Sequence, residues 1–192
     1  MSSRTPLPVT GAWRVGDPVG HRSFFTYPTD RRLALDNGSV MSGIVAAYET
    51  WGQLNADGSN AILLCHAWTG DSHAAGRAED GHISPGWWES AVGPGLAIDT
   101  NQWFVVCANV LGGCQGSTGP ASLHPEDGQP YGSRFPVITI RDMVRVQARL
   151  ADQLGVGVWH SVIGGSMGGM QVLEWAVTFP ERVRSVVPIA TC

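Results

Sequence analysis

The chain contains no lysine: all 12 of its Lys and Arg residues are arginine. Mechanisms that depend on a lysine amine, such as a Walker A loop, a pyridoxal Schiff base or a kinase-type phosphate clamp, are therefore excluded. Strong positive charge is also missing, because the formal net charge is -4 and only 15% of the residues are charged. The composition therefore predicts no nucleic-acid or membrane partner, and small molecules or proteins are the expected partners.

Long apolar runs and closely spaced cysteines are missing as well. The N-terminal sequence MSSRTPLPVTGAW has no apolar core of signal-peptide length, and no later stretch approaches a transmembrane span, so a cytoplasmic location is expected. The 4 cysteines include no C-x-x-C pair, which argues against a zinc ribbon or a disulfide framework. Cys65 and Cys107 lie within apolar runs and are expected to be buried.

The remaining composition predicts one domain preceded by a lead-in. Residues 1–30 are rich in Pro, Gly, Ser and Arg without hydrophobic periodicity, which indicates an extended lead-in. Residues 31–192 are expected to form a single domain, because a chain of this length with 43% hydrophobic residues can bury one core. Within it, residues 33–50 predict two strands, the second over 43–50, separated by a turn at Asp36-Asn37-Gly38.

Short apolar runs then alternate with longer connections. The runs are mostly apolar and do not alternate with polar residues, as is typical of strands buried on both faces of a parallel sheet, and they cover 61–65, 103–109, 158–163 and 183–189. A helix is predicted over 140–154, with a capping box formed by Thr139 and Asp142 and a stop at Gly155. A second helix is predicted over 167–179. The alternation predicts an α/β fold with a mostly parallel sheet and flanking helices.

A glycine-flanked serine lies between the third apolar run and the second helix, in the sequence Gly164-Gly165-Ser166-Met167-Gly168-Gly169. A G-x-S-x-G sequence in this strand-to-helix context is typical of a nucleophile elbow, in which the serine hydroxyl projects above the sheet. Glycines flank such a serine because a side chain there would collide with the neighbouring strand or helix. We therefore expect Ser166 to be a catalytic nucleophile.

A serine nucleophile needs donors for the oxyanion, a base and a group that orients the base. The backbone N–H of Met167, directly after the serine, is one expected donor. The loop after the strand at 61–65 is expected to supply the other, and the backbone N–H of Trp68 is the candidate.

The base and its orienting group are the missing parts, because residues 167–192 contain no Asp and no His. The acids that follow Ser166 are Glu174 and Glu181, on or just after the second helix, and neither is well placed to orient a base. His160 precedes the elbow within a strand and is expected to be structural. The catalytic Asp and His are therefore predicted to lie outside this chain.

Other polar clusters favour structural roles. His66, Asp71, His73 and His82 invite a metal interpretation, but their spacing matches no common zinc motif, and no metal site is predicted. The stretch 112–119 is glycine-rich, but it departs from G-x-G-x-x-G and is expected to be a tight irregular loop. Cys114 within it has no identifiable partner that would make it a nucleophile. No cofactor is expected.

Long motifs carry a specific resemblance. In order along the chain, over about residues 40–190, they are CHAWTGDSH (65–73), GWWESAVGPGLAIDT (86–100), NVLGGCQGSTGPAS (109–122), YGSRFPVITIRDMV (131–144) and GGSMGGMQVLEWA (164–176). Through them the chain resembles the homoserine O-acetyltransferase family, which are acyltransferases of the α/β-hydrolase fold. The resemblance implies that fold, incomplete here at its C-terminal end.

The resemblance also implies a reaction. Ser166 would take an acetyl group from acetyl-CoA and pass it to the hydroxyl of L-homoserine for methionine biosynthesis, with Met167 and Trp68 as oxyanion donors. The family's helical lid, substrate-binding Arg and catalytic Asp and His would follow residue 192, so this chain alone is expected to be inactive. The whole protein is expected to be a homodimer.

Several alternatives stay open at this point. Family members usually carry Leu in place of Trp68, so a succinyl donor, with homoserine or serine as the acceptor, is one alternative. An esterase or thioesterase that uses the same elbow is another. A non-catalytic, truncated fragment is the third.

Overall fold

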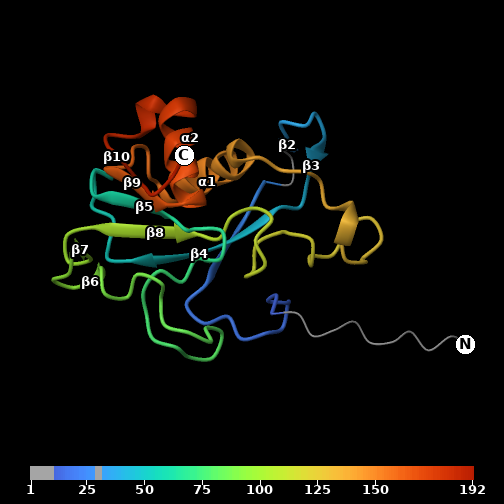
Figure 1. Cartoon of the computed structure of the whole chain (residues 1–192), viewed down its shortest axis with the longest axis horizontal. Coiled ribbons are helices and arrows are strands. Elements are labelled where there is room, and N and C mark those ends of the chain that lie inside the picture. Colours follow the sequence, from blue (N-terminus) through green and yellow to red (C-terminus); the bar gives the residue numbers. More distant parts are fainter. Residues whose placement is uncertain (1–10, 29–31) are drawn as a thin grey trace, which may run out of the picture.

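A computed structural model of the protein describes residues 11–28 and 32–192 (Figure 1). Its centre is a six-stranded sheet in the order β1-β4-β8-β5-β9-β10. In that order the strands are β1 (Ser23–Thr26), β4 (Val45–Trp51), β8 (Phe104–Ala108), β5 (Ala61–Cys65), β9 (Ser161–Gly165) and β10 (Val186–Ile189). The pairs from β8 to β10 are parallel and the pairs β1–β4 and β4–β8 are antiparallel, so the predicted mostly parallel sheet is confirmed.

Both faces of the central strands β5 and β8 are buried, as predicted, but the prediction of a buried strand within 183–189 is wrong: β10 is exposed along its whole length, with Val187 and Ile189 each 41% exposed, because no element packs beyond it among the described residues. On one face, Leu63 and Val106 pack in a cluster with Val144 and Trp175 of the helices. The neighbouring strand residues point the other way and pack with loop residues between β5 and β8; this second cluster includes Ile62, Leu64, Val105, Cys107, Ala74 and Val92. Helices therefore cover one face and long loops the other (Figure 1).

The helices begin and end where their local sequence predicts. In α1 (Ile140–Leu154) the Thr139 and Asp142 side chains form the reciprocal capping box, and Gly155 ends the helix with a φ of 76°. The second helix, α2 (Met167–Thr178), follows β9 directly and packs on β9, β10 and α1. Single-turn 3-10 helices lie at η1 (Gly132–Arg134) and η2 (Pro180–Arg182). No helix among the described residues is long and apolar enough to span a membrane.

The turn at residues 36–38 is confirmed, but its strands differ from the prediction. It joins the short antiparallel strands β2 (Leu33–Ala34) and β3 (Val40–Met41). The longer strand β4 follows separately and pairs with β1 and β8, because its buried residues belong to the central sheet. A second small pair, β6 (Val92–Gly93) and β7 (Ile98–Asp99), is parallel.

The extended lead-in predicted for residues 1–30 needs correction, because β1 lies within it and forms the edge of the sheet. Phe25 of β1 is buried in the core, and the Trp13 ring packs 5.1 Å from that of Phe24. The backbone N–H of Trp13 also donates to the carbonyl of Cys114 at 2.9 Å. Residues 11–28 therefore belong to the folded domain, and residues 1–10, 29 and 30 of the lead-in lie outside the described residues.

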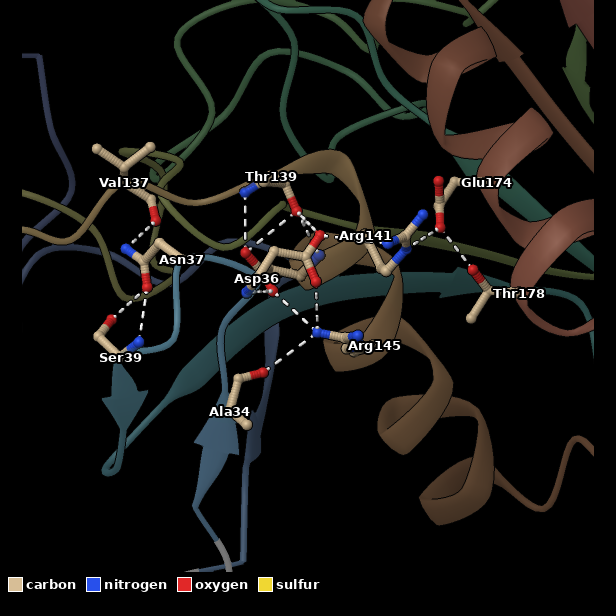
Figure 2. A network of polar contacts seen from close by, with 11 residues as sticks. Ala34, Asp36, Asn37, Ser39, Val137, Thr139, Arg141, Arg145, Glu174 and Thr178 are labelled. Carbon is tan, nitrogen blue, oxygen red and sulfur yellow. Dashed lines mark hydrogen bonds and ion pairs between the residues drawn. The ribbon is translucent and has the colours of Figure 1, made fainter.

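A polar network ties the β2–β3 hairpin to both helices (Figure 2). Its centre is the Asp142 carboxylate, which is fully buried and accepts from the backbone N–H groups of Thr139 at 2.9 Å and Asp36 at 3.1 Å. The Arg145 guanidinium reaches both Asp36 at 2.9 Å and Asp142 at 3.3 Å. This network fixes the hairpin against the N-terminus of α1.

Candidate active site

Ser166 occupies the sharp turn between β9 and α2. Its φ of 55° and ψ of -122° lie in a backbone region that residues other than glycine rarely adopt. Ser166 is also exposed. Such backbone strain costs on the order of 1–3 kcal/mol and persists only where the surroundings hold it. Here the Ser166 N–H donates to Ile189 O at 3.0 Å, and the Thr191 hydroxyl donates to Ser166 O at 2.9 Å. The strand–turn–helix geometry predicted for the elbow is confirmed.

Two of the flanking glycines are required by close backbone contacts. A Cβ at Gly168 would lie 2.0 Å from the carbonyl oxygen of Cys65, and one at Gly164 would lie 2.6 Å from Gly168. Contacts below 3.0 Å with backbone atoms force the backbone to move. The glycines therefore let the first turn of α2 lie against the end of β5, beside the loop that begins at His66.

That loop carries the second predicted oxyanion donor. Residues 67–70 form a turn closed by the Gly70 N–H, which donates to Ala67 O at 2.9 Å. Among the described residues, neither the Trp68 N–H nor the Met167 N–H donates a hydrogen bond to the protein. Trp68 and Met167 line the same pocket, so the two candidate residues lie near one another, and their role as oxyanion donors stays a prediction.

The pocket has a volume of about 680 Å³ and opens where the parallel strands β5 and β8 end. Small-molecule sites of α/β proteins occupy this edge of the sheet and measure roughly 300–1,000 Å³. Its apolar lining includes Trp87, Leu111, Phe135, Ile138 and Met143, and its polar lining includes Arg22, His66, Asp71, His73 and His82. A mainly apolar wall with a few convergent polar groups fits a small organic substrate.

His66 is a structural bridge between loops. It is 1% exposed, its Nδ1–H donates to Ala67 O at 2.8 Å, and its Nε2 accepts the Val110 N–H at 3.2 Å. Burial lowers the pKa of His66 below its ordinary value. The ring is therefore neutral with both nitrogens engaged, and it links the loop after β5 to the loop after β8.

A buried carboxylate that sequence reasoning missed lies beside this loop. Glu49 of β4 is 1% exposed and accepts from the Ser72 hydroxyl and from His73 Nδ1–H, each at 2.9 Å. The His82 ring stacks on the His73 ring with centroids 3.7 Å apart, and His82 Nε2 lies 3.5 Å from the Glu49 carboxylate. The sequence feature that could have revealed this site was Glu49 itself, a charged residue within a strand that is otherwise largely apolar.

These side chains replace the metal cluster considered from the sequence. His73 and His82 gather with Glu49 instead of with His66 and Asp71, and the ligand-type atoms of the three lie within 4.8 Å of one another. The two rings are inclined by only 11°, so their in-plane lone pairs run side by side and do not converge on one point. Tetrahedral zinc requires convergent lone pairs, and the arrangement fits a hydrogen-bonded cluster better.

His82 is buried beside the Arg22 guanidinium and the His73 ring. Burial, together with the Arg22 guanidinium and His73, lowers the pKa of His82 to about 4. His82 Nε2 accepts the His21 N–H at 3.3 Å, as a neutral ring can. Arg22 itself is buried and donates to Gly81 O at 2.7 Å. The cluster therefore holds neutral His82 near neutral pH.

The glycine-rich stretch 112–119 is an irregular loop, as predicted. Two hydroxyls of this loop accept hydrogen bonds from backbone N–H groups of β4. The Ser117 hydroxyl accepts from the Ala47 N–H at 3.0 Å, and the Thr118 hydroxyl accepts from the Val45 N–H at 2.8 Å. The loop's Gly112 N–H donates to Thr118 O at 2.8 Å. Cys114 is exposed, and its sulfur accepts a long hydrogen bond from the Gln115 amide at 4.0 Å.

The remaining candidates for acid–base roles lie away from Ser166. Glu174 accepts from Arg141 at 2.7 Å and from the Thr178 hydroxyl (Figure 2). His160 precedes β9 at the end opposite Ser166, and its ring packs 4.3 Å from that of Trp103. Among the described residues, the Ser166 hydroxyl has no hydrogen-bonded base. Glu174 is therefore not placed to orient a base at Ser166, as expected, and the position of His160 fits the structural role predicted for it.

Comparisons with known proteins agree with this geometry. A family model described as alpha/beta hydrolase fold matches residues 60–192. A homoserine O-acetyltransferase of Thermobifida fusca (strain YX) is 58% identical over 186 residues, covering 97% of this chain and 48% of the relative. The chain therefore spans about half the length of the curated relatives that it matches.

Solved structures of similar proteins support the same fold class. The homoserine O-acetyltransferase of Bacillus anthracis superposes with a TM-score of 0.81 at 37% identity, over 88% of this chain and 46% of that one. Esterase E22 superposes with a TM-score of 0.78 at 38% identity, over 85% of this chain and 46% of that one. The fold class predicted from the sequence is confirmed.

Proposed function

The chain belongs to the alpha/beta hydrolase fold family, and from this premise we propose that it carries the nucleophile of a homoserine O-acetyltransferase. The observation that carries the proposal is Ser166, held at a φ of 55° between β9 and α2 and followed directly by Met167, which lines the pocket. Relatives named homoserine O-acetyltransferase, 54–58% identical over most of this chain, support the substrates. The proposed substrates are acetyl-CoA and L-homoserine, with no further cofactor.

The proposed reaction has two steps. The Ser166 oxygen attacks the thioester carbonyl of acetyl-CoA, the C–S bond breaks, and the serine proton is transferred by way of a base to the CoA thiolate. The homoserine hydroxyl then attacks the acetyl-serine ester, and its proton passes back to the serine oxygen as O-acetyl-homoserine leaves. In both steps negative charge develops on the acetyl oxygen, and the Met167 and Trp68 N–H groups are the proposed donors to it.

We propose that the proton carriers are residues outside this sequence. After Ser166 the sequence has no Asp or His, and the described residues offer the serine no base. In a serine triad, loss of the histidine costs about as much as loss of the serine, on the order of a millionfold in turnover. We therefore expect the 192-residue chain alone to be inactive. Assembly as a homodimer in the cytoplasm is part of the same proposal.

The proposal is tested in a chimera that joins this chain to the part of the Thermobifida fusca relative that it does not cover. With acetyl-CoA, the chimera is expected to carry one acetyl group, which homoserine removes as O-acetyl-homoserine. The Ser166→Ala chimera is expected to carry none. A chimera that folds and stays unacetylated, while the unaltered relative acetylates under the same conditions, would rule the proposal out.

Hydrolysis is the second candidate, because esterase E22 is 38% identical to this chain. A hydrolase passes its acyl group to water, so it releases CoA at the same rate with and without homoserine. The proposed transferase releases CoA much faster when homoserine is present, because the acceptor is needed to clear the acyl-enzyme. Parallel assays with succinyl-CoA in place of acetyl-CoA, and with serine in place of homoserine, separate the remaining alternatives.

A further inference from the structure

Resting on the proposed function, we infer that Glu49 is a positioning residue for acyl transfer. Its buried carboxylate anchors the far end of the loop 66–73 and thereby holds the Trp68 N–H toward the developing oxyanion. Glu49 lies on β4, outside the elbow and outside both oxyanion segments. The proposal concerns how this loop is held, and it needs no contact between Glu49 and substrate.

The loop cannot hold itself in place by packing of its exposed tip. The Trp68 side chain is 79% exposed and Thr69 is also exposed. The hydrogen bond from the Gly70 N–H to Ala67 O closes the turn without fixing where the turn lies. The position of the Trp68 amide must therefore be set by the residues on either side of the tip.

On the near side, His66 fixes the start of the loop. Its ring bridges Ala67 and Val110, and its carbonyl accepts from the buried Gln171 amide at 3.4 Å. Gln171 in turn accepts from Gln147 at 2.7 Å, which ties the loop to both helices. The first residue after β5 is therefore held from three directions.

On the far side, Glu49 fixes the end of the loop. Ser72 is fully buried and His73 is 4% exposed, and each donates to a different oxygen of the Glu49 carboxylate. Asp71 completes the attachment, because its carboxylate accepts the His73 N–H at 2.8 Å and its carbonyl accepts the Trp87 indole N–H at 3.0 Å. Two adjacent residues bound to one carboxylate define the direction in which the chain leaves the turn.

The stacked His82 ring keeps His73 in this orientation. It covers one face of the His73 ring, and the Gly76 backbone lies close to the ring's edge, where an added Cβ would be 2.8 Å from His73. The His73 ring therefore has one arrangement that satisfies packing and the Glu49 bond together. Displacement of a catalytic group by about 1 Å can cost roughly a hundredfold in rate, so a modest shift of this loop would be measurable.

Glu49→Gln is the primary test, because it keeps the side-chain volume and replaces one accepting oxygen with a donor that faces Ser72 or His73. In the 192-residue chain, we expect amide hydrogen exchange of Gly70 and His73 to accelerate at least about tenfold. In the chimera, we expect kcat to fall by on the order of a hundredfold with the KM for acetyl-CoA little changed.

The matched control is Asp142→Asn, which alters an equally buried carboxylate that is bonded to Thr139 and Arg145. It is expected to accelerate exchange at Asp36 and Thr139, whose amides bind Asp142, and to leave Gly70 exchange and kcat unchanged. A loss of kcat as large as that of Glu49→Gln would overturn the proposal, because both losses would then reflect general destabilisation.

A second variant keeps the test decisive if Glu49→Gln fails to fold. Ser72→Ala removes a single bond to the carboxylate, and we expect it to lower kcat roughly tenfold. Where Glu49→Gln folds, the double variant should lose no more than Glu49→Gln alone, because both substitutions act through one anchor. The proposal would be overturned if the loss of kcat in the double variant equalled the product of the two single-variant losses. It would also be overturned if kcat were unchanged in both single variants.

The remaining outcomes separate this proposal from the proposed function. If the chimera does not acetylate Ser166, the function fails, while exchange at Gly70 and His73 still tests the anchoring. Calorimetric titration of the chain with Zn²⁺ tests the competing use of Glu49, His73 and His82 as metal ligands. Micromolar binding that Glu49→Gln abolishes would overturn the positioning role, and no binding supports it.

Discussion

Two buried carboxylates, Glu49 and Asp142, each join segments that are far apart in the sequence, yet they differ in what surrounds them. Asp142 lies at the N-terminus of α1, and its charge is compensated by Arg145 and by backbone N–H groups. Glu49 has only a serine hydroxyl and two histidines around it among the described residues. Asp142 holds a surface hairpin, whereas Glu49 holds the loop that carries Trp68. The same type of interaction therefore serves stability in one region and site geometry in the other.

The largest effect on stability is expected at Gly168, where neighbouring backbone atoms leave no room for a side chain. Gly168→Ala places a Cβ 2.0 Å from Cys65 O, so α2 must move away from the end of β5, next to the loop that Glu49 anchors. We expect a loss of about 3 kcal/mol in the free energy of unfolding, measured by urea denaturation. The matched control is Gly165→Ala, whose added Cβ would meet nothing closer than 3.8 Å. Equal losses of unfolding free energy in the two variants would contradict the close contact between Gly168 and the Cys65 carbonyl oxygen.

Asp142→Asn tests the stability side of the comparison. It turns one accepting oxygen into a donor facing either Arg145 or a backbone N–H, and we expect a loss of about 1–3 kcal/mol in unfolding free energy. Circular dichroism in urea measures it. If stability is unchanged, the hairpin network of Figure 2 carries no net energy and Asp142 is not comparable with Glu49.

Acid should weaken the two regions unequally because, among the described residues, histidines contact Glu49 but not Asp142. The pKa of His82 is about 4 in the folded state and near 6.5 when unfolded, so the unfolded chain binds the extra proton between these values. Stability therefore falls as the pH drops from 6.5 toward 4, and buried His66, whose pKa is also lowered, adds to the fall. Arg22, His73, Asp71 and His21 are the charged or titratable groups around His82, together with Glu49.

The measurement compares unfolding free energies at about pH 7 and about pH 5 for the wild type and for His82→Gln. The variant lacks the titrating ring, so its stability should depend less on pH across this range. Asp142→Asn should keep the full wild-type dependence, because no histidine contacts Asp142 among the described residues. A His82→Gln profile identical to the wild type would contradict the assignment.

The smallest effect is expected at the tip of the loop. The proposed donor at Trp68 is its backbone N–H and its side chain is 79% exposed, so Trp68→Leu should change acetyl transfer by about twofold or less in the chimera. Initial rates with acetyl-CoA and homoserine measure this. A hundredfold loss would show that the indole itself contacts substrate.

Local signals in the sequence were sufficient for much of the fold. The capping box at Thr139, the stop at Gly155 and the elbow at Ser166 depend on residues within one or two turns of each other, and the structure confirms all three. The buried strands β5 and β8 were recognisable because strands covered on both faces of a parallel sheet are nearly continuous apolar runs, whereas the exposure of β10 was not predictable from its apolar residues.

The features that were missed depend on distant residues. Strand β1 is only 4 residues long and becomes a strand by pairing with β4. The role of Glu49 depends on Ser72 and His73, which are separated from it by 23 and 24 residues and reach it through an irregular loop. The path of an irregular loop cannot be predicted from a local hydrophobic pattern, so only the structure shows that Glu49 binds this loop.

The most direct test of the account is where acetyl-CoA places its acetyl group in the chimera. Because the chain has no lysine, trypsin cleaves it only after arginine and releases Ser166 in the peptide 150–182. We predict acetylation of this peptide at Ser166, loss of the label when homoserine is added, and no label in Ser166→Ala. Homoserine acetylation that persists in Ser166→Ala would contradict it.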